Sequence, residues 1–286
     1  MGTGKSTKWL RLIAVLAALM VAFAACGEDT DNGDDGGDAG GQDEEVSLPV
    51  NREGVLQIGS CLDYKPFEFV KGGDEMGFDV DLAEEIASRL GLEVEWVTAN
   101  FDTIFTSVAA GQFDMVAAAS TITEERLQTV DFSDPYFSAR QGLAVNVEKT
   151  PDIKSQADIG EGHVIGVQKG TTGKAWAEEN LVPQGAEIKT FDGAPAAFTD
   201  LEAGGVDAVV NDEGSSLAEV AERPSLEVVE AIETDENYGF AIAKEDAALT
   251  EAVNEALAEI VADGTYAEIF KEWFPDLPVP EQFAGS

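Results

Sequence analysis

The sequence is poor in the residues that build metal centres, disulfide frameworks and nucleophilic active sites. It has one histidine, His163, and two cysteines, Cys26 and Cys61, among 286 residues. A single histidine and the lack of a cysteine pair at zinc-site spacing give no basis for a transition-metal site. No serine or cysteine is matched with the histidine in a catalytic arrangement. We therefore expect no metal ion, no cofactor and no enzyme.

Basic residues are also few. The 17 Lys and Arg are opposed by 56 Asp and Glu, and the formal net charge is −39. Such a charge repels nucleic acids and anionic lipid surfaces, so we expect no nucleic-acid partner. Two interpretations stay open: an acidic coat that confers solubility, or adaptation to high salt, where counter-ions screen the self-repulsion. The second predicts that folding stability rises with added salt.

The N-terminal apolar run is too short for a retained membrane-spanning helix. It ends at Cys26, starts near residue 12 and follows three cations, Lys5, Lys8 and Arg11, whereas a spanning helix needs about 20 apolar residues. Charged, apolar and small-residue segments in this order are the layout of an export signal, here residues 1–25. Ala24-Ala25-Cys26 resembles the lipobox of bacterial lipoproteins, which implies lipidation of Cys26. The alternative is a plain secreted protein.

An acidic, glycine-rich segment follows Cys26. Residues 27–45 contain almost no apolar side chain and cannot bury enough surface to fold alone. We expect residues 26–51 to form a flexible tether between the lipid and a folded body.

The body alternates predicted strands and helices twice. The first series is a strand at 55–59, a helix N-capped by Asp79, a strand at 92–97, a helix near 102–110 and a strand at 113–119. The second series is a strand at 164–167, a helix at 173–179, a strand at 186–191, a helix at 194–203 and a strand at 206–211, followed by helices at 246–262 and 266–273. Strands and helices in alternation predict two α/β lobes with parallel strands. A cleft between two lobes is a favoured place for a small ligand.

Four segments carry a resemblance to a known family. They are GFDVDLA at 77–83, STITEER at 120–126, VDFSDPY at 130–136 and GVQKGTT at 166–172. In this order and spacing, over about residues 54–275, the chain resembles the bacterial extracellular solute-binding proteins of the polar amino acid type (family 3), which feed ABC importers.

The resemblance implies the type II periplasmic-binding-protein fold, an α/β fold of two lobes. Each lobe would be a mixed sheet flanked by helices, with the ligand cleft between the lobes. Lobe 1 would comprise residues 52–143 and 237–286, and lobe 2 residues 144–236. The two crossings, near 142–146 and 234–238, would be the hinges.

The α-carboxylate of a free amino acid is best matched by the planar, two-donor guanidinium of an arginine. Arg126 follows a buried strand, at the carboxyl end where ligands bind open α/β sheets, and the resemblance assigns it to the carboxylate. The alternative is that Arg126 forms an ion pair at the protein surface. The same resemblance adds Thr121, a backbone group of Ala119, and the amide of Thr172 at a helix N-terminus.

The ammonium group of the ligand needs an acid at the cleft. Asp212 follows the strand at 206–211, and the resemblance assigns it this role. Tyr64 and Phe101 match positions where the family places rings against the ligand, although either could belong to the core.

The side-chain pocket departs from the family pattern. Cys61 stands where many relatives have Asp, and Gln168 and Asn211 lie near the same pocket by the resemblance. This set lacks a clear charge and favours a neutral polar amino acid such as glutamine. Asp63 or Glu68 would reverse that prediction if either points inward.

The sequence thus predicts the extracytoplasmic, lipid-anchored substrate-binding component of an ABC importer at the outer face of the cell membrane. Its partners would be a free amino acid and the membrane permease subunits, and it would act as a monomer. Two alternatives remain: a periplasmic dehydratase on the same fold, with Glu68 or Glu213 as general acid, and a ligand-binding module of a signalling receptor.

Overall fold

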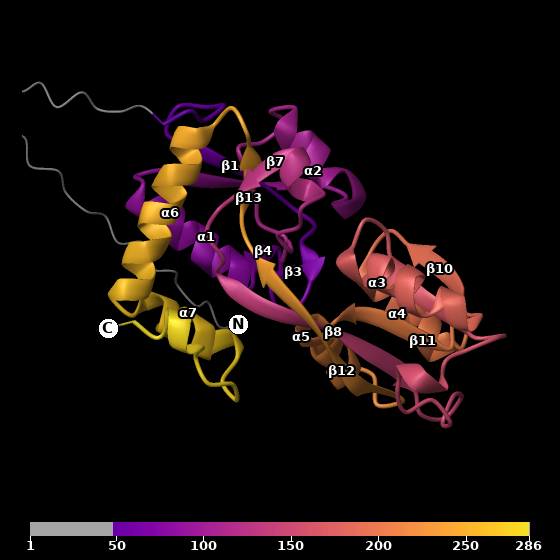
Figure 1. The fold of residues 1–286 in the computed structure, drawn as a ribbon. Coiled ribbons are helices and arrows are strands. Elements are labelled where there is room, and N and C mark those ends of the chain that lie inside the picture. The colour runs from indigo at the N-terminus through magenta and orange to yellow at the C-terminus, as the bar shows by residue number, and fades with distance from the viewer. Residues whose placement is uncertain (1–47, 286) are drawn as a thin grey trace, which may run out of the picture. The chain divides into compact units, whose positions relative to one another are not determined.

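The computed structural model describes residues 48–285, which fold into three sheets and the helices packed on them (Figure 1). The predicted export signal and Cys26 lie outside the described residues, as does most of the predicted tether. Within residues 48–285, no helix combines the length and the apolar character that crossing a membrane requires.

The first sheet and its helices form lobe 1. Its strands, in the order β5-β1-β6-β13-β7, are Glu93–Thr98, Val55–Ser60, Met115–Val116, Ala241–Ala243 and Val130–Phe132. β1 runs parallel to β5 and β6, whereas β13 runs antiparallel to β6 and β7. The helices of lobe 1 are α1 (Phe78–Arg89), α2 (Phe101–Ala109), α6 (Ala247–Ala262) and α7 (Thr265–Trp273). A small sheet of β2 (Asp63–Tyr64), β3 (Glu68–Lys71) and β4 (Asp74–Met76) precedes α1.

The second sheet and its helices form lobe 2. Its strands, in the order β10-β9-β11-β8-β12, are Glu187–Phe191, Val164–Gln168, Ala208–Asp212, Phe137–Asn146 and Leu226–Tyr238. β9 is parallel to β10 and β11, and β8 is antiparallel to β11 and β12. The helices are α3 (Thr172–Asn180), α4 (Ala194–Ala203) and α5 (Glu213–Ala221). Short 3₁₀ helices span Arg126–Gln128, Gln156–Asp158, Val182–Gln184 and Glu281–Phe283.

The long β8–β12 ladder begins where the chain crosses between the lobes (Figure 1). It pairs Phe137 with Tyr238 at that end and Asn146 with Leu226 at the other. Phe67 of lobe 1 packs edge-on against both Phe137 and Tyr238, with ring centroids 5.1 and 5.4 Å away. The predicted fold class, two mixed-sheet lobes flanked by helices, is confirmed. The lobe boundaries at 143/144 and 236/237 stay a prediction.

Two local predictions were wrong. Asp79 does not cap α1: the cap position is Gly77, at φ 138, and Asp79 is fully buried inside the first turn. A side chain at residue 77 would collide with the Phe67 carbonyl, so glycine is required there. The strand predicted at 113–119 pairs only at Met115–Val116, because the chain then turns at Ala119, whose φ is 43.

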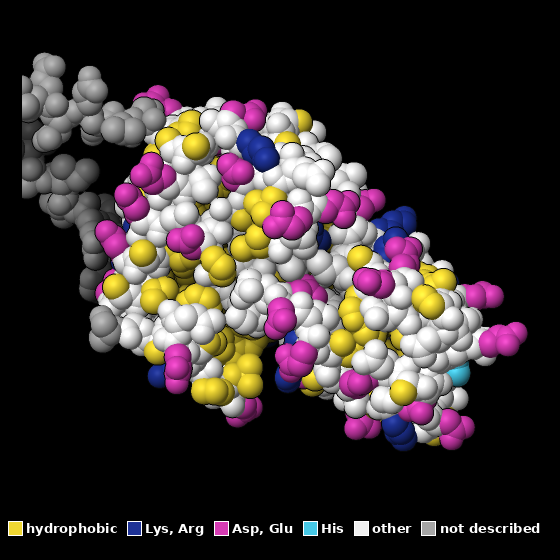
Figure 2. All heavy atoms as spheres, viewed as in Figure 1, with side chains coloured by type: hydrophobic (Ala, Val, Ile, Leu, Met, Phe, Trp, Pro, Cys, Tyr) yellow, Lys and Arg dark blue, Asp and Glu magenta, His cyan; other side chains and the backbone are white. Residues whose placement is uncertain are grey.

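The surface carries the expected excess of acids. Figure 2 shows Asp and Glu side chains spread over the visible face of both lobes, with few Lys and Arg among them.

Candidate ligand-binding site

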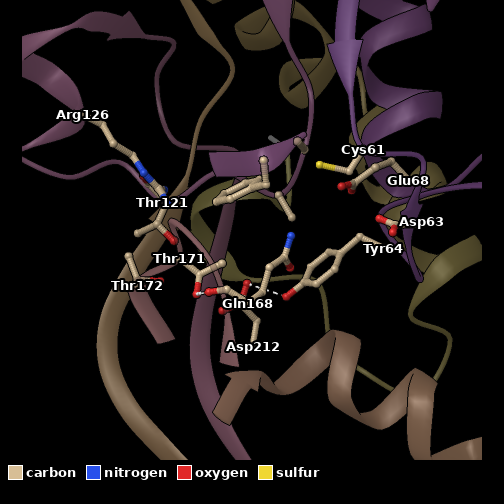
Figure 3. A pocket seen from close by; sticks show the side chains of 13 residues that line it. Cys61, Asp63, Tyr64, Glu68, Thr121, Arg126, Gln168, Thr171, Thr172 and Asp212 are labelled. Atoms are coloured by element: carbon tan, nitrogen blue, oxygen red, sulfur yellow. Dashed lines mark hydrogen bonds between the residues drawn. The ribbon is translucent and has the colours of Figure 1, made fainter. Parts of the chain in front are cut away.

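A cavity is lined by residues of both lobes (Figure 3). Nine of the ten predicted binding residues line it. Lobe 1 contributes Cys61, Tyr64, Phe101, Ala119, Thr121 and Arg126. Lobe 2 contributes Gln168, Thr172 and Asp212. The tenth, Asn211, is not in the lining; it lies just behind it and accepts a hydrogen bond from the Tyr64 hydroxyl at 3.1 Å.

Arg126 is held at one end of the cavity. The Thr123 hydroxyl accepts the Arg126 backbone N–H at 3.2 Å. The guanidinium donates to the Thr121 carbonyl at 2.6 Å and, across the cleft, to the Gly170 carbonyl at 3.1 Å. It also lies over the Phe105 ring, 4.5 Å from its centroid. These contacts fix the plane of the guanidinium, and no carboxylate of residues 48–285 forms a salt bridge with it.

The charge of Arg126 survives its burial. Burial lowers its pKa to about 10, against the raising effect of nearby acids, Asp212 first. At neutral pH the side chain is therefore a cation, poor in hydration and available to an anion.

A buried acid that the sequence did not reveal holds the two threonines. Glu236, near the end of β12, is 8% exposed. One of its carboxylate oxygens accepts the hydroxyls of both Thr121 and Thr172, each at 2.7 Å. Gln141 of β8 donates its amide to the other oxygen at 2.9 Å. Both hydroxyls are thus engaged as donors to Glu236. Thr172 begins α3, and a backbone amide at a helix N-terminus is a donor suited to an anion.

Asp212 lies where β11 meets α5. It accepts hydrogen bonds from the Tyr238 hydroxyl at 2.5 Å, the Tyr64 hydroxyl at 3.0 Å and the Gln141 amide at 2.5 Å. Burial and then the charge of Glu236 raise its pKa to about 6, although these hydrogen bonds act in the opposite direction. The bond from Tyr64 joins lobe 1 to lobe 2.

The far end of the cavity is acidic. Asp63 and Glu68 are in the lining beside Cys61, and Figure 3 shows all three on the side away from Arg126. Glu68 is 1% exposed, and burial raises its pKa well above the ordinary value, with Asp79, Asp63 and Asp212 adding to the effect. Burial, and next the charge of Glu68, likewise raises the pKa of the Cys61 thiol.

Asp79 supports the lining from behind. One of its oxygens accepts the Ala119 N–H at 2.8 Å and the Tyr136 hydroxyl at 2.7 Å. Burial raises its pKa to about 6. These bonds pin Ala119 in its left-handed conformation and so fix the turn that leads to Thr121.

Other chemistry has little support in the described part of the chain. Residues 48–285 contain no group of three or more His, Cys, Asp and Glu side chains that could hold a metal ion. His163 accepts the Gly160 N–H through Nδ1 at 3.0 Å and does not line the cavity. Glu213, one of the two acids considered for catalysis, is ion-paired with Arg140 and is also outside the lining.

The chain is similar to known solute-binding proteins. The sequence profile of the bacterial extracellular solute-binding proteins, family 3, matches residues 56–276. A probable histidine-binding protein of Neisseria gonorrhoeae is 31% identical over 272 residues, which cover 93% of this chain and 95% of that protein.

Two solved structures are similar over about three quarters of the chain. An ancestral arginine-binding protein bound to arginine is 40% identical, with a TM-score of 0.74, and the match covers 78% of this chain and 99% of that one. An ancestral amino acid-binding protein, a precursor of cyclohexadienyl dehydratase, is 39% identical with a TM-score of 0.72, covering 77% and 96%.

Proposed function

The chain belongs to the bacterial extracellular solute-binding proteins, family 3, and from that premise we propose that it is the extracytoplasmic substrate-binding subunit of an ABC importer for a free amino acid. The observation that carries the proposal is the placement of Arg126 and Asp212 in one cavity lining, on opposite lobes. A cation and an acid in this arrangement match the carboxylate and the ammonium of a zwitterion.

Binding would proceed by lobe closure. The amino acid first meets Arg126 and the Thr121 amide on lobe 1, and closure then adds Asp212 and the Thr172 amide from lobe 2. Cross-cleft bonds such as Tyr64 to Asp212 and Arg126 to Gly170 favour the closed arrangement. The permease subunits of the importer would recognise the closed form.

We propose a binding protein rather than a dehydratase. Of the two acids considered as a general acid, Glu213 is engaged by Arg140 outside the lining, and Glu68 is placed at the far end from Arg126. A turnover assay with prephenate and arogenate tests this choice, and product formation by the purified chain would contradict it.

A thermal-shift screen against the common amino acids tests the proposed function. The screen would use the chain from residue 26 onward with the substitution Cys26→Ser, so that no lipid is attached. A ligand present at 100 times its Kd stabilises the folded state by about 2.7 kcal/mol, which raises the Tm of a domain of this size by about 5 to 10 °C. We expect one chemical class of amino acid to give such a shift. A flat response to all of them would reject the proposal.

We also propose that Cys26 carries a lipid and holds the protein on the outer face of the cell membrane. Cys26→Ser should move the protein from the membrane fraction to the soluble extracytoplasmic fraction, because the anchor is lost. Cys61→Ser is the matched control and should stay in the membrane fraction. Equal partitioning of the Cys26→Ser variant and the wild type would refute lipidation.

A further inference from the structure

The acidic end of the cavity contains a carboxylate without a partner. Glu68 is buried to 1% exposure, and its Oε2 has no hydrogen-bond partner among the described residues. Leaving a buried carboxylate without donors is costly. Among residues 48–285, no lysine or arginine other than Arg126 lines the cavity, and Arg126 lies at the opposite end (Figure 3). This part of the chain therefore supplies no cation to Glu68.

The direction of the Glu68 side chain is set by the small sheet. Tyr64 and Glu68 are directly opposite each other in the antiparallel β2–β3 pair, so both side chains emerge on the same face. Tyr64 reaches Asp212 through its hydroxyl, which brings Glu68 into the same cavity, one step further from Arg126. The order along the cavity is thus a site for a carboxylate, a site for an ammonium, and then Glu68.

We propose that Glu68 anchors a positively charged ligand side chain, with Asp63 at the rim and Cys61 as a neutral wall, so that the amino acid bound is cationic, with a guanidinium or ammonium at the end of its side chain. The inference rests on the proposed function. It replaces the neutral polar ligand that the sequence favoured, because the condition for reversing that prediction is met: Asp63 and Glu68 both line the cavity.

Cys61 adds no charge to the acidic end of the cavity, so Glu68 is the main partner of the ligand cation. The Cys61 thiol has a pKa that is raised by burial and by Glu68, so it stays neutral. Glu68 faces three other acids, Asp79 from α1, Asp63 from β2 and Asp212 from β11. A bound cation offsets this repulsion, ionises Glu68 and expels its proton.

Isothermal titration calorimetry with arginine and citrulline tests the proposal, because the two ligands share a shape and differ in charge. The wild-type chain, again from residue 26 with Cys26→Ser, should bind arginine or lysine at least about 30-fold more tightly than citrulline or glutamine. Titrations in buffers of different ionisation enthalpy should show proton release when arginine or lysine binds. Equal affinity for arginine and citrulline would overturn the inference.

Glu68→Gln should lower the affinity for the cationic ligand by about 30-fold or more, abolish most of the proton release and leave citrulline and glutamine within about threefold. Glu75→Gln, an exposed position of the same small sheet, is the matched control and should change neither. If Glu68→Gln does not fold, the arginine and citrulline comparison on the wild type still decides. Thermal stabilisation by neutral or acidic amino acids alone would contradict the cationic subsite and leave the proposed function intact. Stabilisation by no amino acid would contradict both the subsite and the proposed function.

Discussion

Arg126→Ala is expected to weaken amino acid binding by about 30-fold to several thousand-fold. Arg126 is the only cation among the residues that line the cavity in the described part of the chain, and its pKa of about 10 keeps it charged at neutral pH. Truncating one member of a buried, hydrogen-bonded charge pair costs about 2 to 5 kcal/mol, which corresponds to that range of Kd. Calorimetry with the ligand found by the screen measures it.

The geometry of the guanidinium, and not its charge alone, should contribute to this effect. Arg126→Lys keeps a cation but loses the planar pair of donors and the position over the Phe105 ring, so an intermediate loss is expected. Arg52→Ala is the matched control, because Arg52 is exposed and pairs with Glu95 away from the cavity. Unchanged affinity in Arg126→Ala would exclude Arg126 as the carboxylate partner, and an equal loss in Arg52→Ala would show that the effect is not local.

The sequence could place Arg126 and Asp212 because each follows a strand that can be recognised locally. The apolar run before Ser120 and the run at 206–211 both read as buried strands, and ligands bind at the carboxyl ends of such strands. Local patterns also gave the ranges of α4, α6 and α7 to within a residue or two. These features depend on neighbours in the chain, which a sequence displays.

Features that depend on pairing between distant segments could not be predicted. Glu236 and Gln141 reach the site only because β12 and β8 form one long ladder, and nothing in either segment marks a polar contact. Glu68 turns inward because of its register opposite Tyr64. Asn211 was predicted in the side-chain pocket; it lies outside the lining, although the Tyr64 hydroxyl donates to both Asn211 and Asp212.

Asp212→Asn should weaken binding by about 30-fold, because a neutral amide cannot pair with the charge of the ligand ammonium. Asp212 already accepts three hydrogen bonds, from Tyr238, Tyr64 and Gln141, so the carboxylate is preorganised and the ammonium adds the missing positive charge. Asp152→Asn, an exposed acid of lobe 2, is the matched control and should bind as the wild type does.

The affinity should also depend on pH, with a sign fixed by the direction of the shift. The pKa of Asp212 is raised from 3.8 to about 6 by burial and by Glu236. In the folded protein without ligand the acid is therefore protonated below about pH 6, and its raised pKa lowers the folding stability progressively as the pH rises from 3.8 to about 6. Binding needs the ionised form. As pH falls below about 6, the association constant should therefore decrease by up to about tenfold per pH unit.

The test must separate Asp212 from Glu68, which titrates in the same cavity. Calorimetry between pH 7.5 and 5 in the Glu68→Gln background isolates the contribution of Asp212, and adding Asp212→Asn to that background should flatten the remaining slope. A slope that persists in the double variant would assign the titration to a group other than Asp212 and Glu68. A flat profile in the Glu68→Gln background would contradict the prediction. It would mean that Asp212 is ionised throughout this pH range, because the hydrogen bonds from Gln141, Tyr64 and Tyr238 offset the effect of burial on its pKa.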